Sequence, residues 1–98
     1  MLTQVASIIK ENIRETDLAG RFGGDEFMVI LTNTDLNTAQ AIAERIRLVV
    51  EDAVFIDGLR VTISGGVRQY NREAFLDFIH FADMNLYQAK SHGKNRIR

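Results

Sequence analysis

The chain has 98 residues, which is enough for one domain with a modest core and too few for two. A net charge of −1 and a pI near 6.1 exclude the strongly basic surface of a nucleic-acid-binding protein. The absence of cysteine excludes disulfides and thiolate metal sites, and no apolar run reaches membrane-spanning length. Because no signal-peptide pattern opens the chain, we expect a cytoplasmic protein without membrane contact.

The first third of the chain predicts a helix followed by a hairpin. Apolar residues recur at helical spacing over residues 2–13, which indicates an amphipathic helix. Two strands, Leu18–Phe22 and Phe27–Leu31, are predicted on either side of a pair of glycines. Since the second strand is apolar at every position, we expect it to be covered on both faces.

Two further helices are predicted. Asp35 or Asn37 can cap a helix whose apolar positions lie within residues 39–50. A third helix starts near Glu73 and ends before Gly93, a residue suited to the left-handed turn that follows a helix.

A second hairpin is predicted between these helices. Asp57 and Gly58 separate short apolar runs at residues 54–56 and 59–64, which favours a type I′ turn. A short edge strand is expected at residues 95–98.

This order of elements predicts an α+β fold, an antiparallel sheet flanked by helices. The strand Phe27–Leu31 has the composition of a central strand, yet the chain supplies few strands to flank it. We therefore expect it to pair with Val61–Val67, or a second copy of the chain to cover its edge. An unpaired apolar edge would otherwise invite association.

The residues Gly23, Gly24, Asp25, Glu26 and Phe27 lie where the first hairpin must turn. Glycines permit a positive φ and let a ligand approach the backbone closely. Adjacent acids contribute little to folding at such a turn, but carboxylates suit a hard divalent cation that carries a triphosphate. A turn whose acids simply face water is the alternative interpretation.

Three motifs extend this pattern over most of the chain. They are Arg14-x-x-Asp17-x-x-x-Arg21-Phe22-Gly-Gly-Asp-Glu-Phe, Val61–Val67, and Ala82-Asp83-x-x-Leu86-Tyr87-x-Ala89-Lys90-x-x-Gly93-Lys94-Asn95-Arg96. The first resembles the signature of the GGDEF family, the bacterial diguanylate cyclases, joined to the inhibitory site often found before it. The second motif, Val61–Val67, resembles the strand before the family's closing helix, and the third resembles that helix with the turn after it. The resemblance implies a cyclase-palm, ferredoxin-like fold.

The resemblance also implies roles for the residues of the turn. Asp25 is expected to bind the catalytic Mg²⁺ or Mn²⁺ and to act as a base for the attacking ribose hydroxyl. Glu26 is expected to be the second acid of the catalytic turn, beside Asp25. Gly23 and Gly24 are expected to let the backbone lie against the substrate, GTP.

Lys90 and Lys94 match basic positions that contact the phosphates of GTP in the family. The implied reaction condenses two GTP molecules to cyclic di-GMP and pyrophosphate. Each site holds one GTP, so the working unit is expected to be a homodimer. Sensor domains are expected elsewhere in the full-length protein.

Arg14 and Asp17 match the family's inhibitory site, in which an arginine and an aspartate hold the product, cyclic di-GMP. An arginine can fork onto phosphate or guanine, and an aspartate can accept from guanine N–H groups. Arg45 matches a further arginine that reaches bound product. A polar helix end and an exposed helix arginine are the alternative interpretations of these residues.

The family domain normally opens with a segment that carries its first central strand, a metal-binding aspartate and the residues that read guanine. No stretch of residues 1–98 matches it, so we expect a single, N-terminally truncated GGDEF domain without that strand. Such a chain should have little or no cyclase activity alone. The alternative function is a regulatory module that binds cyclic di-GMP through Arg14 and Asp17, and a third possibility is a piece without a ligand.

Overall fold

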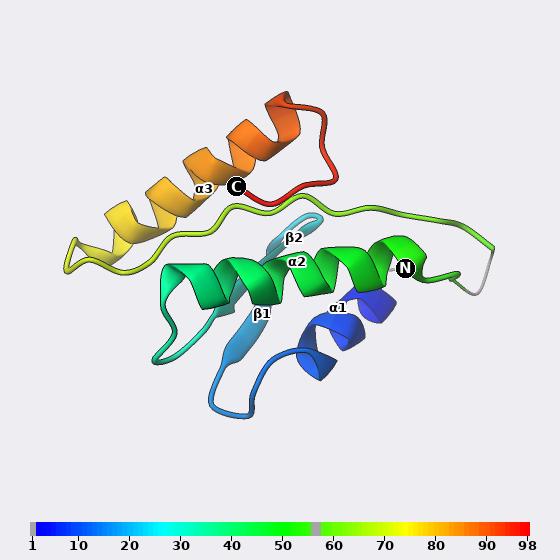
Figure 1. The fold of residues 1–98 in the computed structure, drawn as a ribbon, viewed down its shortest axis with the longest axis horizontal. Helices are drawn as coiled ribbons and strands as arrows, with labels where there is room; N and C mark the ends of the chain where they lie inside the picture. The colour runs from blue at the N-terminus through cyan, green and yellow to red at the C-terminus, as the bar shows by residue number, and fades with distance from the viewer. Residues whose placement is uncertain (1, 56–57) are drawn as a thin grey trace.

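A computed structural model describes residues 2–55 and 58–98, which form three helices and one two-stranded sheet (Figure 1). The elements follow in the order α1 (Leu2–Glu11), β1 (Leu18–Gly23), β2 (Glu26–Ile30), α2 (Leu36–Asp52) and α3 (Phe75–Ser91). The expected α+β class and the antiparallel first hairpin are confirmed. None of the helices in the described part of the chain has the length and apolar character needed to cross a membrane.

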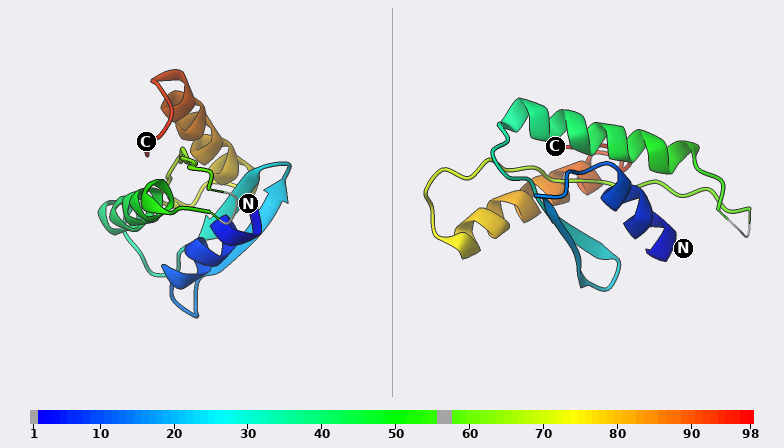
Figure 2. Two further views of the ribbon diagram at one scale, coloured as in Figure 1. Left: turned by 90° about the vertical axis from the view of Figure 1, so that its right-hand side faces the viewer. Right: turned by 90° about the horizontal axis from the view of Figure 1, so that it is seen from below.

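The core lies between α1, α2 and the hairpin. Its buried residues come from both helices and from the segment after α2: Val5, Ile9, Ile46, Val50 and Phe55. One face of the hairpin packs on this cluster, together with two residues of the later extended segment: Ala19, Phe27, Val29, Val61 and Ile63. That segment runs between α2 and α3, so the molecule has helices on both sides of its extended layer (Figures 1 and 2).

The ends of the helices follow local side-chain chemistry. Asp35, rather than Asn37, caps α2, because its carboxylate accepts from the Thr38 amide at 2.7 Å. Helix α1 ends at Glu11, two residues earlier than expected, where the side-chain Nδ2 of Asn12 donates to the Ile8 carbonyl at 2.7 Å. A side chain that bonds the last free carbonyls ends a helix without further turns.

The predicted second hairpin is only partly correct. The chain does reverse, with hydrogen bonds from the Phe55 amide to the Leu59 carbonyl at 3.2 Å and from the Gly58 amide to the Phe55 carbonyl at 2.7 Å. No strand forms among the described residues of this stretch, and two residues of the expected turn region, Ile56 and Asp57, lie outside them.

The predicted pairing of Phe27–Leu31 with Val61–Val67 is wrong. Within the described residues, β2 pairs only with β1. The later segment instead forms a parallel bridge between Gly65 and Ile97, which confirms a short pairing role for the C-terminal residues. Covering of the β2 edge by a second copy of the chain stays a prediction.

In this segment Gly66 packs closely against α3. A Cβ atom at Gly66 would lie 2.2 Å from the Ala82 carbonyl oxygen and 2.2 Å from the Leu86 amide nitrogen. Only a residue without a side chain permits this approach. The segment is therefore held on α3 and on the C-terminal residues rather than beside β2.

We predict that Gly66→Ala lowers the free energy of unfolding by roughly 1–3 kcal/mol, because the new methyl group must displace backbone atoms of α3. Gly20→Ala in β1 is the matched control, since a Cβ there meets nothing within 4 Å. Its effect should stay within about 0.5 kcal/mol. Urea unfolding of both variants measures the difference, and equal values would contradict the packing argument.

Candidate nucleotide site

The turn between β1 and β2 is shaped by its glycines. Gly24 has a φ of 52°, a left-handed conformation that favours glycine. The register shifts between Arg21 and Gly23, which pairs with Glu26, so a bulge precedes the turn. The exposed Arg21 side chain stabilises the turn, because its Nε donates to the Gly24 carbonyl at 2.7 Å.

The surface of this turn is open. A Cβ at Gly23 or Gly24 would meet nothing within 4 Å. Asp25 is exposed and Glu26 is half-buried. A ligand can therefore approach both the backbone and the two carboxylates from solvent.

The acids of the turn do not form a complete metal cage. No group of three or more potential His, Cys, Asp or Glu ligands occurs among residues 2–55 and 58–98. Mg²⁺ is usually held by one or two carboxylates, with waters and substrate phosphates as its other ligands. Asp25 and Glu26 fit a magnesium ion that arrives with a triphosphate, and they do not fit one held by this protein alone.

The two lysines lie at the other end of the candidate site. Lys90 is in the last turn of α3, and Lys94 follows it in a turn where its φ is 63°. Both side chains are exposed, and no ion pair occupies either of them in the described residues. They are available for an anion.

In the described part of the chain, no ion pair joins either lysine to Asp25 or Glu26. Figure 2 shows the hairpin turn and the end of α3 set apart. A hollow of 280 Å³ beside the turn is lined by apolar residues of the hairpin with Arg21, and not by Asp25 or the lysines. A second hollow, of 390 Å³, lies between the start of α2 and residues 67–71 and also excludes them.

Arg14 and Asp17 do come together, in a tight polar clasp. The Arg14 Nε lies 3.2 Å from the Asp17 carboxylate, which also accepts from the Arg14 amide at 2.9 Å and the Thr32 amide at 2.9 Å. The Arg14 guanidinium donates further to the Thr32 carbonyl at 2.5 Å and to the Thr34 hydroxyl at 2.6 Å. The clasp therefore joins the loop before β1 to the loop after β2.

The two members of the clasp differ in access to solvent. The side chain of Asp17 is 0% exposed and that of Arg14 is 54% exposed. The Thr32 amide hydrogen bond, helped by Arg14, lowers the pKa of Asp17 to about 2. Both Asp17 oxygens already accept hydrogen bonds, so of this pair only Arg14 presents an open surface to a ligand.

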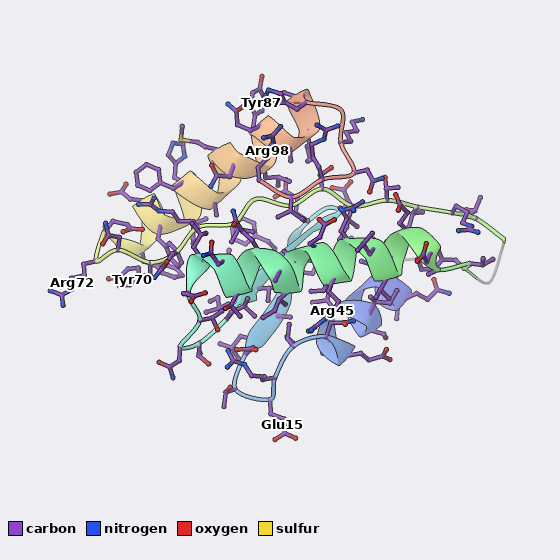
Figure 3. The ribbon with its side chains drawn as sticks, viewed as in Figure 1. Glu15, Arg45, Tyr70, Arg72, Tyr87 and Arg98 are labelled. Atoms are coloured by element: carbon purple, nitrogen blue, oxygen red, sulfur yellow. The ribbon has the colours of Figure 1, made fainter. Side chains whose placement is uncertain are left out.

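Arg45 lies close to this clasp without joining it. Its Nε donates to the Asn12 side-chain oxygen at 3.1 Å, and its terminal nitrogen donates to the Asn12 carbonyl at 2.6 Å. The side chain thus runs from α2 to the end of α1, two residues before Arg14 (Figure 3). Its contacts stabilise the end of a helix.

Sequence reasoning missed a polar network around Arg47 on α2. The Arg47 guanidinium bonds both oxygens of Glu44 and reaches Asn95, in the turn that carries Lys94, at 2.8 Å. The hydrogen bond with Arg47 lowers the pKa of Glu44. The helical spacing of Glu44, Arg47 and Glu51 is a signal in the sequence, but the contact with Asn95 is not.

We predict that Asp17→Asn lowers the midpoint of thermal unfolding by several degrees at pH 7, because a buried carboxylate that accepts backbone hydrogen bonds is lost. Because the pKa of Asp17 is lowered on folding, its carboxylate stabilises the fold at pH values above its unfolded pKa of 3.8. This stabilisation is lost as the pH falls toward the folded pKa of about 2. The difference between the variant and the unmodified chain should therefore shrink over that range in circular dichroism melts.

Asp25→Asn is the matched control, since it changes an exposed acid of the same hairpin. Its midpoint should remain close to that of the unmodified chain. Equal midpoints for Asp17→Asn and Asp25→Asn at pH 7 would show that the clasp does not stabilise the fold.

Comparison with known proteins agrees with the motifs. The family model described as "Diguanylate cyclase, GGDEF domain" matches residues 1–96. Diguanylate cyclase A of Treponema denticola is 45% identical over 102 residues, which cover 99% of this chain and 28% of that protein. The chain thus spans less than a third of this relative's length.

Solved structures show the same fold. The active GGEEF domain of a diguanylate cyclase from Vibrio cholerae has a TM-score of 0.89 and 30% identity, over 98% of this chain and 64% of the other. The GGDEF domain of DgcB from Caulobacter crescentus, in complex with c-di-GMP, has a TM-score of 0.90 and 26% identity, over 98% of this chain and 60% of the other. On the family match, the sequence identity and the shared fold, the chain belongs to the GGDEF family of diguanylate cyclase domains.

Proposed function

We propose that this chain provides the GTP-binding turn and the product-binding arginine of a diguanylate cyclase, which condenses two GTP molecules to cyclic di-GMP and pyrophosphate. The observation that carries the proposal is the open Gly-Gly-Asp-Glu turn, with a left-handed Gly24 and two accessible carboxylates. A cytoplasmic location follows from the need for GTP.

Asp25 and Glu26 would hold a divalent cation, which offsets phosphate charge when bound. In the reaction, the 3′-oxygen of one GTP forms a bond to the α-phosphorus of another. The bond from that phosphorus to the β-phosphate oxygen breaks, and pyrophosphate leaves with the electron pair. The hydroxyl proton passes to a base, for which Asp25 is the candidate, and a reciprocal second step closes the ring.

Lys90 and Lys94 are the candidate phosphate contacts, because both ammonium groups are exposed and outside any ion pair in the described residues. Their part is to bind and orient the triphosphate. Since each site would hold one GTP, two copies of the site must face each other. A homodimer is therefore the proposed working unit.

The chain alone is proposed to bind GTP but to turn it over slowly. Its turn offers two acids and no third ligand among the described residues. The end of α3, where Lys90 lies, is set apart from the hairpin turn (Figure 2). Catalysis by placement and electrostatics needs all of these groups on one substrate pair.

Asp25→Ala should weaken Mg²⁺-dependent GTP binding about tenfold, roughly the free energy of one charge-assisted contact. Isothermal titration of the chain with GTP, with and without Mg²⁺, measures this. Asp52→Ala, which removes an exposed acid at the end of α2, is the matched control and should bind as the unmodified chain does.

Pyrophosphate release in the same samples should be slow for every form of the chain. Brisk turnover by the unmodified chain would show that its site is complete. Equal GTP affinities for Asp25→Ala and Asp52→Ala would remove Asp25 from the site.

The second candidate function is regulatory binding of cyclic di-GMP. The half-exposed guanidinium of Arg14, held in place by Asp17, Thr32 and Thr34, supports it. A preorganised guanidinium suits a charge-assisted contact with phosphate or guanine. DgcB, a structural neighbour, was solved with c-di-GMP bound.

Arg14→Ala should weaken cyclic di-GMP binding by about tenfold, as expected for a lost charge-assisted contact, and should leave GTP binding intact. Arg98→Ala removes an exposed arginine near the C-terminus and serves as the control. Titration of the three forms with cyclic di-GMP gives the comparison. Unchanged affinity for Arg14→Ala would rule out this use of the clasp.

A further inference from the structure

A polar network joins the middle of α2 to the turn after α3. The Arg47 guanidinium donates to Glu44 through Nε at 3.0 and 2.9 Å and lies 3.6 Å from the Glu51 carboxylate. Its NH1 group donates to the Asn95 side-chain oxygen at 2.8 Å. The Arg47 side chain is only 13% exposed, whereas the Glu44 and Glu51 side chains are 43% and 38% exposed.

Asn95 is the point where three distant segments meet. Its side-chain amide donates to the Glu51 carboxylate on α2 and its oxygen accepts from Arg47. Its backbone amide donates to the Ser64 hydroxyl at 3.1 Å, in the extended segment. Both polar atoms of this side chain are therefore engaged, and the turn is anchored on two sides.

The anchored turn has an unfavourable backbone. Lys94 and Asn95 have φ values of 63° and 45°, two consecutive left-handed residues that are not glycine. Asparagine tolerates this conformation, but at Lys94 it persists only where the surroundings determine it. The Lys94 amide also donates to the Ala89 carbonyl at 3.0 Å, at the end of α3, and the contacts of Asn95 complete the restraint.

The backbone conformation of Lys94 sets the direction in which its side chain leaves the chain. We propose that Arg47 and Asn95 are positioning residues for Lys94, which hold its ammonium group where the triphosphate of GTP binds. This inference rests on the proposed function, because it takes Lys94 as a phosphate contact. Arg47 acts through Asn95, because its own guanidinium is occupied by Glu44, Glu51 and Asn95.

A purely structural role for the network gives a different expectation. In that case, loss of Arg47 or Asn95 lowers stability but leaves GTP affinity unchanged in the folded fraction. Any loss of GTP affinity from another cause would add to the loss caused by Lys94→Ala, since the two sites would then be independent. A positioning role gives no further loss once the lysine is gone.

The test is a double-mutant cycle on GTP binding with Mg²⁺. Arg47→Gln removes the charge and the fork, and Asn95→Gly removes the side-chain contacts while the left-handed backbone stays accessible. Each should weaken GTP binding about fivefold, and neither should weaken binding further when combined with Lys94→Ala. Arg47→Lys, which keeps the charge without the fork, is the second variant in case Arg47→Gln does not fold.

Arg72→Asn is the matched control. Arg72 also has a positive φ, of 62°, which asparagine tolerates, and it points outward at the far end of the molecule (Figure 3). It should bind GTP as the unmodified chain does, and circular dichroism confirms that each variant is folded.

The outcomes separate this inference from the proposed function. If Lys94→Ala weakens GTP binding but Arg47→Gln and Asn95→Gly do not, or if the losses add, the positioning role is overturned and the GTP site stands. If the unmodified chain does not bind GTP, or Lys94→Ala binds as tightly, the proposed phosphate contact fails and the positioning role fails with it. The inference is also overturned if Arg47→Gln and Asn95→Gly weaken GTP binding no more than Arg72→Asn does.

Discussion

The buried carboxylate of Asp17 ties together the two loops that enter and leave the hairpin. It accepts backbone amides from both loops, and Arg14 adds an ion pair and reaches across to Thr32 and Thr34. A buried charge is tolerated only when it is paired and hydrogen-bonded in this way. The base of the hairpin is thereby closed on α1 and α2, and the turn at its other end projects toward solvent.

The strands of the hairpin pack on the core, whereas its turn is open to solvent. Ala19, Phe27 and Val29 pack on the core and fix its orientation. The turn makes no comparable packing, and its glycines leave free space around the backbone. The same contacts that anchor the hairpin leave the Arg14 side chain half-exposed, so stability and the proposed ligand binding would share one set of contacts.

The second half of the proposed phosphate site depends on a different set of long-range contacts. Gly66 lets the extended segment lie directly on α3, and Asn95 joins the following turn to that segment and to α2. These contacts place the lysines through the packing of three segments rather than through the hairpin. The two halves therefore reach a common substrate only if both packings hold.

Local patterns in the sequence were sufficient for the three helices, the first hairpin and the family to which the chain belongs, and they narrowed the α2 cap to Asp35 or Asn37. Those features depend on residues within a few positions of each other. The pairing expected for Val61–Val67 failed, because the packing of Gly66 on α3 depends on atoms of Ala82 and Leu86. Likewise, only the tertiary structure showed the contact between Arg47 and Asn95, which lies 48 positions later. The spacing of residues in the sequence does not predict a contact between separate segments.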